Sequence, residues 1–127
     1  MADLFSDLTS VVLAGTLDAS SAKHRAIAEN IANVETPGYI RKDVAFSDQL
    51  REALRESDPN NAMSRVRETL PEQVEDITTP MGQNANNVSI DKEMADLTKN
   101  SIEYESLTRL VSMKFAMLMN AISEGKK

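Results

Sequence analysis

The sequence contains no cysteine, no tryptophan and only one histidine. Without cysteine, the chain forms no disulfides and offers no thiolate for zinc, for iron–sulfur clusters or for nucleophilic catalysis. A single histidine also leaves no histidine-rich metal site. Aromatic residues make up only 4% of the chain, whereas hydrophobic residues make up 41%. This largely aliphatic composition favours long helices over a compact core built on a sheet.

Clustered positive charge and long apolar runs are also missing. The formal net charge is -6, and residues 43–88 carry 9 acidic but only 4 basic side chains. Because phosphate neutralisation needs clustered lysine and arginine, we expect no nucleic-acid binding. No apolar run approaches the roughly 18 residues that span a bilayer. Acids at Asp3 and Asp7 stand where a secretory signal peptide carries positive charge. We therefore expect a soluble chain with no membrane span and no cleaved signal.

The positions of the four prolines divide the chain into three parts. All four lie between residues 37 and 80, and proline breaks helices because it lacks an N–H and has a fixed φ. Long helices are therefore expected only outside that window. We predict an N-terminal helical arm over residues 1–36 and a C-terminal coiled-coil helix over 89–127. Between them, residues 37–88 are expected to form a turn, a short helix and an irregular acidic middle.

The C-terminal arm has the strongest helical pattern. Its apolar positions alternate steps of four and three over more than four heptads, which is typical of a helix that pairs with another helix. A helix over 90–123 would be about 51 Å long at 1.5 Å per residue, too long for one small globular core. Ser89 or Asp91 is expected to cap its start, and Gly125 its end. The predicted seam consists of Ile90, Met94, Leu97, Tyr104, Val111, Phe115, Leu118 and Ile122, with Ser101 and Thr108 at the two remaining positions.

The N-terminal arm repeats the pattern more weakly. Its predicted seam consists of Leu13, Leu17, Ile27, Ile31 and Val34, with Ser20 and His24 between them. An upstream stripe of Leu4, Leu8 and Val11 is out of phase with this seam, and the phase changes near Gly15. We therefore expect a bend, or two separate helices, at Gly15. The helix should end before 36–38, where proline and glycine favour a tight turn.

The middle of the chain gives shorter signals. Phe46, Leu50 and Leu54 follow helical spacing and predict a short helix over about 48–56, capped by Ser47. Residues 58–61 are predicted to form a turn, and 73–77 a short strand at best. Residues 81–87 have the composition of a turn and few apolar side chains, so a flexible loop is expected there.

Together these elements predict a mainly α fold in which the two long terminal helices pair as a coiled-coil hairpin. A second apolar stripe runs beside the C-terminal seam and consists of Leu107, Leu110, Met117 and Ala121. A helix that is apolar over so much of its circumference needs more than one neighbour. This stripe either packs on the middle segment or contacts other copies and partner proteins, and we regard it as a candidate surface between subunits.

No set of residues predicts catalysis, a metal site or a cofactor. His24 lacks a nucleophile or an orienting acid nearby in the sequence, so a packed or interfacial histidine is the favoured interpretation. The acidic cluster of Glu72, Glu75 and Asp76 lacks apolar neighbours that could form a pocket, and we interpret it as a solvated run of charge. The pattern at 87–89 matches a glycosylation acceptor but is short enough to occur by chance. We therefore predict that the protein is not an enzyme.

Residues 28–39 resemble the N-terminal motif of the bacterial flagellar rod and hook proteins. The resemblance rests on Asn30, Ala32, Asn33, Thr36, Pro37, Gly38 and Tyr39. Residues 41–46 and 86–94, together with the rest of the C-terminal arm, are similar to the proximal rod proteins of that family. The short middle, which has no inserted globular domain, also fits proximal rod proteins better than the distal rod or the hook.

The resemblance implies a structural subunit of the flagellar basal-body rod, the shaft that crosses the periplasm, transmits torque and conducts exported subunits. It also implies export by the flagellar type III apparatus without signal cleavage. The implied partners are other copies of the chain, other flagellar rod proteins, the rod-base adapter protein, and the export gate with its surrounding ring.

Two other hypotheses remain open from the residues alone. A soluble regulator or chaperone that binds amphipathic partner helices would explain both arms, but it leaves the 30–39 motif unexplained. A hydrolase that uses His24 and an acid of the middle segment would predict loss of function in His24→Ala.

Overall fold

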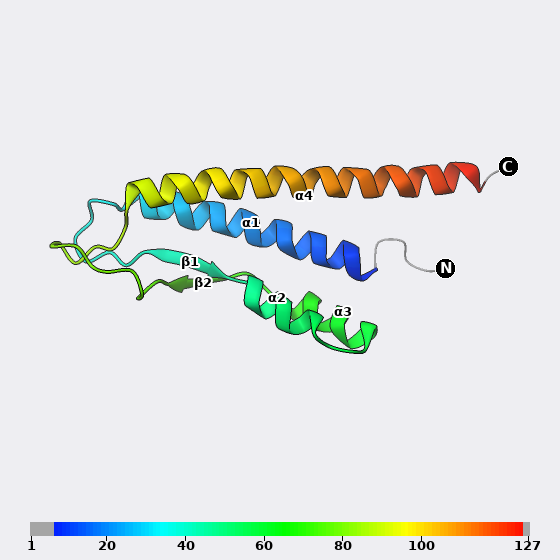
Figure 1. The fold of residues 1–127 in the computed structure, drawn as a ribbon, viewed down its shortest axis with the longest axis horizontal. Helices are drawn as coiled ribbons and strands as arrows, with labels where there is room; N and C mark the ends of the chain where they lie inside the picture. The colour runs from blue at the N-terminus through cyan, green and yellow to red at the C-terminus, as the bar shows by residue number, and fades with distance from the viewer. Residues whose placement is uncertain (1–6, 126–127) are drawn as a thin grey trace.

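A computed structural model describes residues 7–125 as an elongated, mainly helical molecule. Figure 1 shows a long C-terminal helix, α4, lying along a shorter N-terminal helix, α1, which separates it from the middle segment. The two helices run antiparallel. The predicted fold class, with two long terminal helices around a partly irregular middle, is confirmed. In chain order the elements are α1 (Leu8–Ala32), β1 (Lys42–Ala45), α2 (Ser47–Leu54), α3 (Pro59–Glu68), β2 (Glu72–Glu75) and α4 (Ile90–Glu124).

Helix α1 is continuous, so the predicted alternative of two separate helices that meet at Gly15 is wrong. Asp7 caps the helix, because its side chain accepts a hydrogen bond from the Ser10 amide at 3.2 Å. The glycine has a packing role instead: a Cβ at Gly15 would lie only 3.2 Å from Cζ of the buried Phe46. The missing side chain therefore allows the Phe46 ring to approach the helix. The helix ends at Ala32, before the turn at 36–38, as predicted.

The middle segment folds back along α1 as two strands with two short helices between them. β1 pairs with β2 in antiparallel register, with Lys42 opposite Glu75, so the predicted short strand is confirmed with slightly different ends. Helix α2 is also confirmed, but Ser47 is its first residue and not its cap. Phe46 occupies the cap position, and no side chain makes a capping hydrogen bond there.

Helix α3 begins where a turn was predicted, so that prediction is wrong. The Asp58 side chain accepts a hydrogen bond from the Asn60 amide at 2.8 Å, and Pro59 occupies the first helical position. Proline is well suited to that position because its missing N–H has no intrahelical partner to lose. The residues that were predicted to form a turn therefore form the start of a helix. The chain beyond them continues in helical conformation, with Ala62 and Val66 buried.

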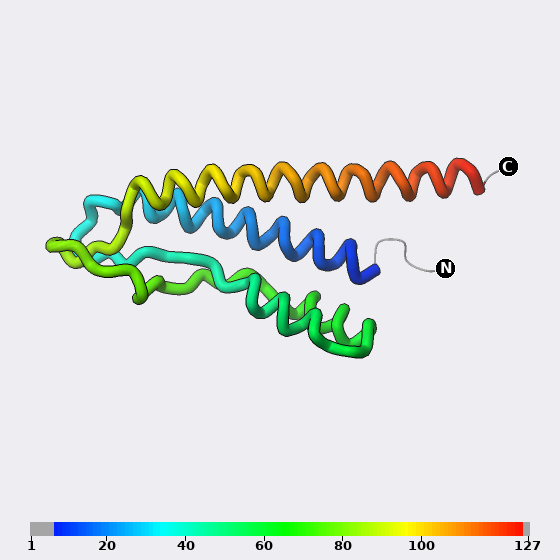
Figure 2. The backbone as a smooth tube through the Cα atoms, in the orientation of Figure 1, coloured from blue at the N-terminus to red at the C-terminus, as the bar shows by residue number. Residues whose placement is uncertain are grey.

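Helix α4 has 35 residues, which corresponds to a length of about 53 Å. Ser89 occupies its cap position but makes no capping hydrogen bond with its side chain, and Gly125 follows its last residue. Among the elements of residues 7–125, α4 packs chiefly against α1. Figure 2 shows that α4 continues past the first turn of α1, so its C-terminal end lies beyond the paired region. No helix within 7–125 combines the length and the apolar character that crossing a bilayer would require.

The buried apolar core is small and lies between α1 and the middle segment. Its residues are Ala19, Ala26, Ile27, Phe46, Ala53, Ala62 and Val66. An equally large set of buried residues is polar or charged: Ser20, Asn30, Arg41, Asn86, Asn87, Glu93 and Asn100. Helix α4 contributes only Glu93 and Asn100 to the buried residues. Its apolar side chains are therefore at most half-buried in the single chain.

Candidate functional site

Arg41 lies at the centre of a buried polar cluster where the start of β1 meets the start of α4. Its Nε donates a hydrogen bond to Glu93 Oε1 at 2.5 Å. Its Nη1 donates to Asp76 Oδ2 at 3.0 Å, and its Nη2 to Asp96 Oδ2 at 3.1 Å. The side chains of Arg41 and Glu93 are 3% and 0% exposed. This set, which we name the Arg41 cluster, joins β1, the segment after β2 and the first two turns of α4.

The charges in the Arg41 cluster stabilise one another. Burial acts to lower the pKa of Arg41, but the hydrogen bond and the charge of Glu93 outweigh it, so the pKa of the guanidinium is raised. The hydroxyls of Thr78 and Thr79 hold the pKa of the Asp76 carboxyl well below its usual range. The prediction that Asp76 belongs to a solvated run of charge is therefore wrong. The other two acids of that run belong to β2, whose side chains are exposed.

Asn30, from the 28–39 motif, connects α1 to this cluster and is fully buried. Its Oδ1 accepts hydrogen bonds from the Lys42 amide at 2.8 Å and from the Tyr39 hydroxyl at 3.3 Å. Its Nδ2 donates to the Lys42 carbonyl at 2.8 Å and to Glu93 Oε2 at 3.1 Å. One amide thus satisfies both backbone groups of Lys42 and ties the first strand to α4 through Glu93.

Asn86 holds the turn that follows α1. Its Nδ2 donates to three carbonyls of that turn, those of Asn33, Val34 and Thr36, at 2.9, 3.1 and 2.8 Å. The 81–87 segment was predicted to be a flexible loop. It is irregular, but its last two residues are buried and hydrogen-bonded, and it therefore fixes the two ends of the turn relative to α4.

Asn87 completes the same junction from the side of the strands. Its Oδ1 accepts a hydrogen bond from the Arg41 amide at 2.5 Å, and its Nδ2 donates to the Asp76 carbonyl at 2.6 Å. Because this amide nitrogen is engaged and the residue is only 4% exposed, the glycosylation pattern at 87–89 does not present an acceptor to solvent.

The other motif residues shape the turn itself. Gly38 has a φ of 73°, a left-handed conformation that favours glycine because it has no Cβ, and its amide donates to the Asn84 carbonyl at 3.0 Å. The Asn33 side chain donates to the Glu29 carbonyl at 2.8 Å and closes the end of α1. Ala32, Thr36 and Pro37 are exposed. The motif therefore combines buried hydrogen bonds with an exposed tip.

A second polar contact lies midway along the α1–α4 seam. Ser20 Oγ donates to Asn100 Oδ1 at 3.0 Å, and Asn100 Nδ2 donates to the Ser20 carbonyl at 2.9 Å. Sequence reasoning counted Asn100 among the residues similar to the rod proteins but assigned it no contact, and it missed the pairing of Arg41 with Glu93. A signal was nevertheless present in the sequence. Positions 93, 100, 107 and 114 are spaced by seven residues, and all of them except Leu107 are polar or charged. The face of α4 that meets α1 therefore includes Glu93, Asn100 and Leu107 beside the half-buried residues of the predicted seam.

The predicted seam residues consequently divide into two sets. In the first set, Ile27 is buried and the other residues are half-buried: Leu13, Leu17, Ile31, Val34, Leu97, Val111 and Leu118. The second set stays 45–49% exposed and consists of Ile90, Met94, Tyr104, Phe115 and Ile122. Of the second stripe, Leu107 is half-buried and lies with Val44 and Phe46 around a small pocket, whereas Leu110, Met117 and Ala121 are exposed.

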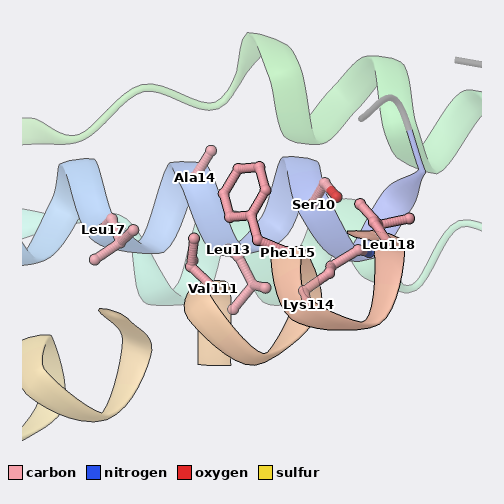
Figure 3. A pocket seen from close by; sticks show the side chains of 8 residues that line it. All are labelled: Ser10, Leu13, Ala14, Leu17, Val111, Lys114, Phe115 and Leu118. Carbon is pink, nitrogen blue, oxygen red and sulfur yellow. The ribbon is translucent and has the colours of Figure 1, made fainter. Parts of the chain in front are cut away.

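An apolar groove opens between the start of α1 and the last third of α4. It has a volume of about 250 Å³ and is lined by Ser10, Leu13, Ala14, Leu17, Val111, Lys114, Phe115 and Leu118. Figure 3 shows the Phe115 side chain directed from α4 toward α1. The only ionisable lining residue, Lys114, forms an ion pair with Asp7, and this hydrogen bond lowers the pKa of the Asp7 carboxyl. The groove is therefore apolar and has no unbalanced charge.

The residues considered for catalysis are not brought together. His24 is exposed on α1, and the acids of the Arg41 cluster bind an arginine. Within residues 7–125, no three histidine, aspartate or glutamate side chains are grouped so that they could hold a metal ion. The arrangement that the described residues do present is a polar junction at one end and an apolar, incompletely covered helix pair at the other.

No family model matches the chain, but it is similar to several curated proteins described as flagellar basal body rod protein FlgB. The protein of Bacillus subtilis (strain 168) is 33% identical over 119 residues, which cover 90% of this chain and 92% of the relative. That of Borreliella burgdorferi is 28% identical over 113 residues, covering 78% and 84%. That of Escherichia coli (strain K12) is 22% identical over 122 residues, covering 86% and 88%. Because the similarity extends over nearly the full length of both chains, this chain belongs to the FlgB family of flagellar basal body rod proteins.

Proposed function

We propose that the chain is a structural, non-enzymatic subunit of the proximal rod of the flagellar basal body, and that its apolar surface is completed by neighbouring subunits. The relatives are described as basal body rod proteins, and they share most of their length with this chain. The single observation that carries the structural part of the proposal is the exposure of α4.

The C-terminal part of α4 carries apolar side chains on several faces, but among the elements of residues 7–125 it packs chiefly against α1. Between residues 110 and 123 the only charged side chain is Lys114, which pairs with Asp7. Leu110, Met113 and Met117 are 49%, 61% and 62% exposed. Burying a large aliphatic side chain contributes roughly 1.5–3 kcal/mol. Contacts with further helices would therefore stabilise this surface considerably, and an apolar patch of this kind marks an interaction site.

The two ends of the hairpin are held by different interactions and have different roles. At one end the Arg41 cluster, Asn30 and Asn86 define how α1, the turn and α4 meet. At the other end the helices are held by half-buried aliphatic side chains and one exposed ion pair. We assign Leu110, Met117 and Ala121 to contacts between subunits, whereas the half-buried Leu107 lines a small pocket with Phe46 and is not part of this surface.

The family to which the chain belongs supports a more specific proposal for its place in the organelle. We propose that it forms part of the rod where the shaft crosses the periplasm, that it contacts other copies, other rod proteins and the rod-base adapter protein, and that it lies near the export gate and its surrounding ring. Export through the flagellar type III apparatus, without signal cleavage, would deliver it there. A rigid junction between α1 and α4 suits a part that transmits torque.

The test is the double variant Leu110→Ser/Met117→Ser, expressed in place of the wild-type chain in an otherwise motile strain. We expect the variant to be folded and exported but absent from purified basal bodies, and the cells to be non-motile. The matched control is Lys99→Ser/Glu105→Ser, two exposed positions on the same helix, which should be incorporated. Normal incorporation of the double variant would contradict the assignment of this surface. Wild-type chain that stays in the cytoplasm and never co-purifies with basal bodies would instead favour a soluble regulator.

A further inference from the structure

We propose that the apolar groove between α1 and α4 receives the projecting end of α4 from a second copy of this chain. By projecting end we mean residues 119–123, which follow Leu118, the last α4 residue that lines the groove. The proposal rests on the proposed function and specifies which surfaces of two subunits meet. Copies would then join groove to end, in one direction.

The groove defines the chemistry of its occupant. Its walls are the aliphatic side chains of Leu13, Leu17 and Val111, with Phe115 and Leu118 at one side. The one ammonium group in the lining is neutralised by Asp7. An acidic or basic peptide would therefore find no counter-charge in the groove, and its own charges would lose hydration without compensation. The occupant should be an uncharged apolar segment.

The projecting end has this chemistry. Met119 and Ile122 are 63% and 47% exposed, and no residue from 115 to 123 is charged. Five residues of helix extend about 7.5 Å at 1.5 Å per residue. Methionine adapts to irregular apolar cavities because its side chain is unbranched and flexible. The end therefore suits a groove that is apolar and only partly enclosed.

An α4 end that occupies the groove must come from another copy. Helix α4 is continuous from Ile90 to Glu124 and forms one wall of the groove, so its own end cannot fold back into it. The groove and the projecting end are different surfaces, and a contact between different surfaces is heterologous. Heterologous contacts generate rings or open helical arrays, whereas self-complementary ones close as dimers. A shaft built from this chain requires the first kind.

The chain offers a direct test because it contains no cysteine. Every disulfide between two copies of it would therefore come from introduced residues. Two variants with different tags, Ala14→Cys in the groove and Met119→Cys in the projecting end, are expressed together and basal bodies are purified under mild oxidation. Ala14 is exposed and small, so the substitution is conservative. We expect a mixed disulfide between the two tagged chains. It should form at least about tenfold faster than in a pair with Ala28→Cys, because docking raises the effective concentration of the thiols.

Ala28→Cys is the matched control, an exposed alanine on α1 that lies outside the groove. Ser10→Cys, one helical turn before Ala14 in the lining of the groove, provides a second reporter if Ala14→Cys is poorly incorporated. Disulfides mainly between two Met119→Cys chains, a mixed yield no higher than the Ala28→Cys control, or linkage of the groove cysteine to a different protein would each overturn the inference. These results leave the proposed function intact. Absence of the tagged wild-type chain from basal bodies would instead contradict the proposed function itself.

Discussion

Glu93 and Arg41 form a buried ion pair between residues that are 52 positions apart, with Nε and Oε1 separated by 2.5 Å. The glutamate is completely buried, and its second oxygen accepts a hydrogen bond from Asn30. One carboxylate thus joins the first strand and the end of α1 to the start of α4. In a chain whose apolar core is small, this polar contact carries much of the connection between the terminal helices.

We expect Arg41→Met to destabilise the chain by about 3–5 kcal/mol, because it leaves the carboxylate of Glu93 buried without its partner. Urea unfolding followed by circular dichroism measures this change. The double variant Arg41→Met/Glu93→Gln should be more stable than Arg41→Met alone, because the orphaned charge is removed while an acceptor for Asn30 remains. A double variant that is less stable than the single one would show that the charge of Glu93 has another partner.

An exposed pair on α4 provides the control for that experiment. Arg109 and Glu105 are joined at 2.6 Å, with side chains 76% and 65% exposed. Exposed helix pairs of this spacing contribute about 0.3–0.5 kcal/mol. Arg109→Met should therefore change the free energy of unfolding far less than Arg41→Met. Equal effects would mean that the burial of Arg41 has no energetic consequence.

Substitution at Gly15 should separate its packing role from its helix propensity. A Cβ there would lie 3.2 Å from Cζ of Phe46. Gly15→Leu should therefore destabilise the chain by about 1–3 kcal/mol through overpacking, although leucine favours helix. Ala28→Leu, at an exposed position of the same helix, should stay within about 0.5 kcal/mol of wild type. Thermal unfolding of both variants checks this, and a stabilised Gly15→Leu would contradict the close approach of Phe46.

The parts of the fold that the sequence predicted are those with repeating apolar patterns. The heptads of α4 and the i, i+4 spacing around Leu50 each identify a helix because one face of the element alone carries the information. The start of α3 was misread because an aspartate followed by proline is equally suited to a turn and to the first turn of a helix. Two separate helices at Gly15 were expected as one alternative because the reason for this glycine, the ring of Phe46, lies 31 positions away in the sequence.

The buried polar contacts could not be predicted in the same way. Arg41 belongs to a segment with no helical period, and nothing near it in the chain indicates that Glu93 is its partner. Asn86 looks like one of several loop amides, although its side chain binds three carbonyls of a distant turn. Asn100 is different, because its seven-residue spacing from Glu93 was visible and would have placed both on the face toward α1.

We expect stability to decrease as the pH falls from about 5, and Asp76 to contribute to this loss. The hydroxyls of Thr78 and Thr79 lower the pKa of Asp76 in the folded chain, whereas in the unfolded chain it should be near 3.9. The unfolded state then binds more protons between these two values, so acid favours unfolding. Urea midpoints measured from pH 7 to pH 3 should fall for the wild type. The decline should be shallower for Asp76→Asn, and an unchanged slope in that variant would remove Asp76 as a cause.

Asn86→Asp should loosen the turn of the 28–39 motif without removing the side chain's volume. A carboxylate cannot donate a hydrogen bond. The carbonyls of Asn33, Val34 and Thr36 would therefore lose the donor that they share in the wild type, the side-chain Nδ2 that lies 2.8–3.1 Å from them. Leaving buried polar groups unsatisfied costs about 1–3 kcal/mol. Hydrogen exchange should show faster opening of the Gly38 amide, whose partner Asn84 lies in the same loop. Asn61→Asp, at an exposed position of α3, is the control and should leave that amide unchanged. Unaltered protection of the Gly38 amide in Asn86→Asp would mean that the turn is held by its own backbone and by Asn30. The three hydrogen bonds from Asn86 would then not stabilise the turn.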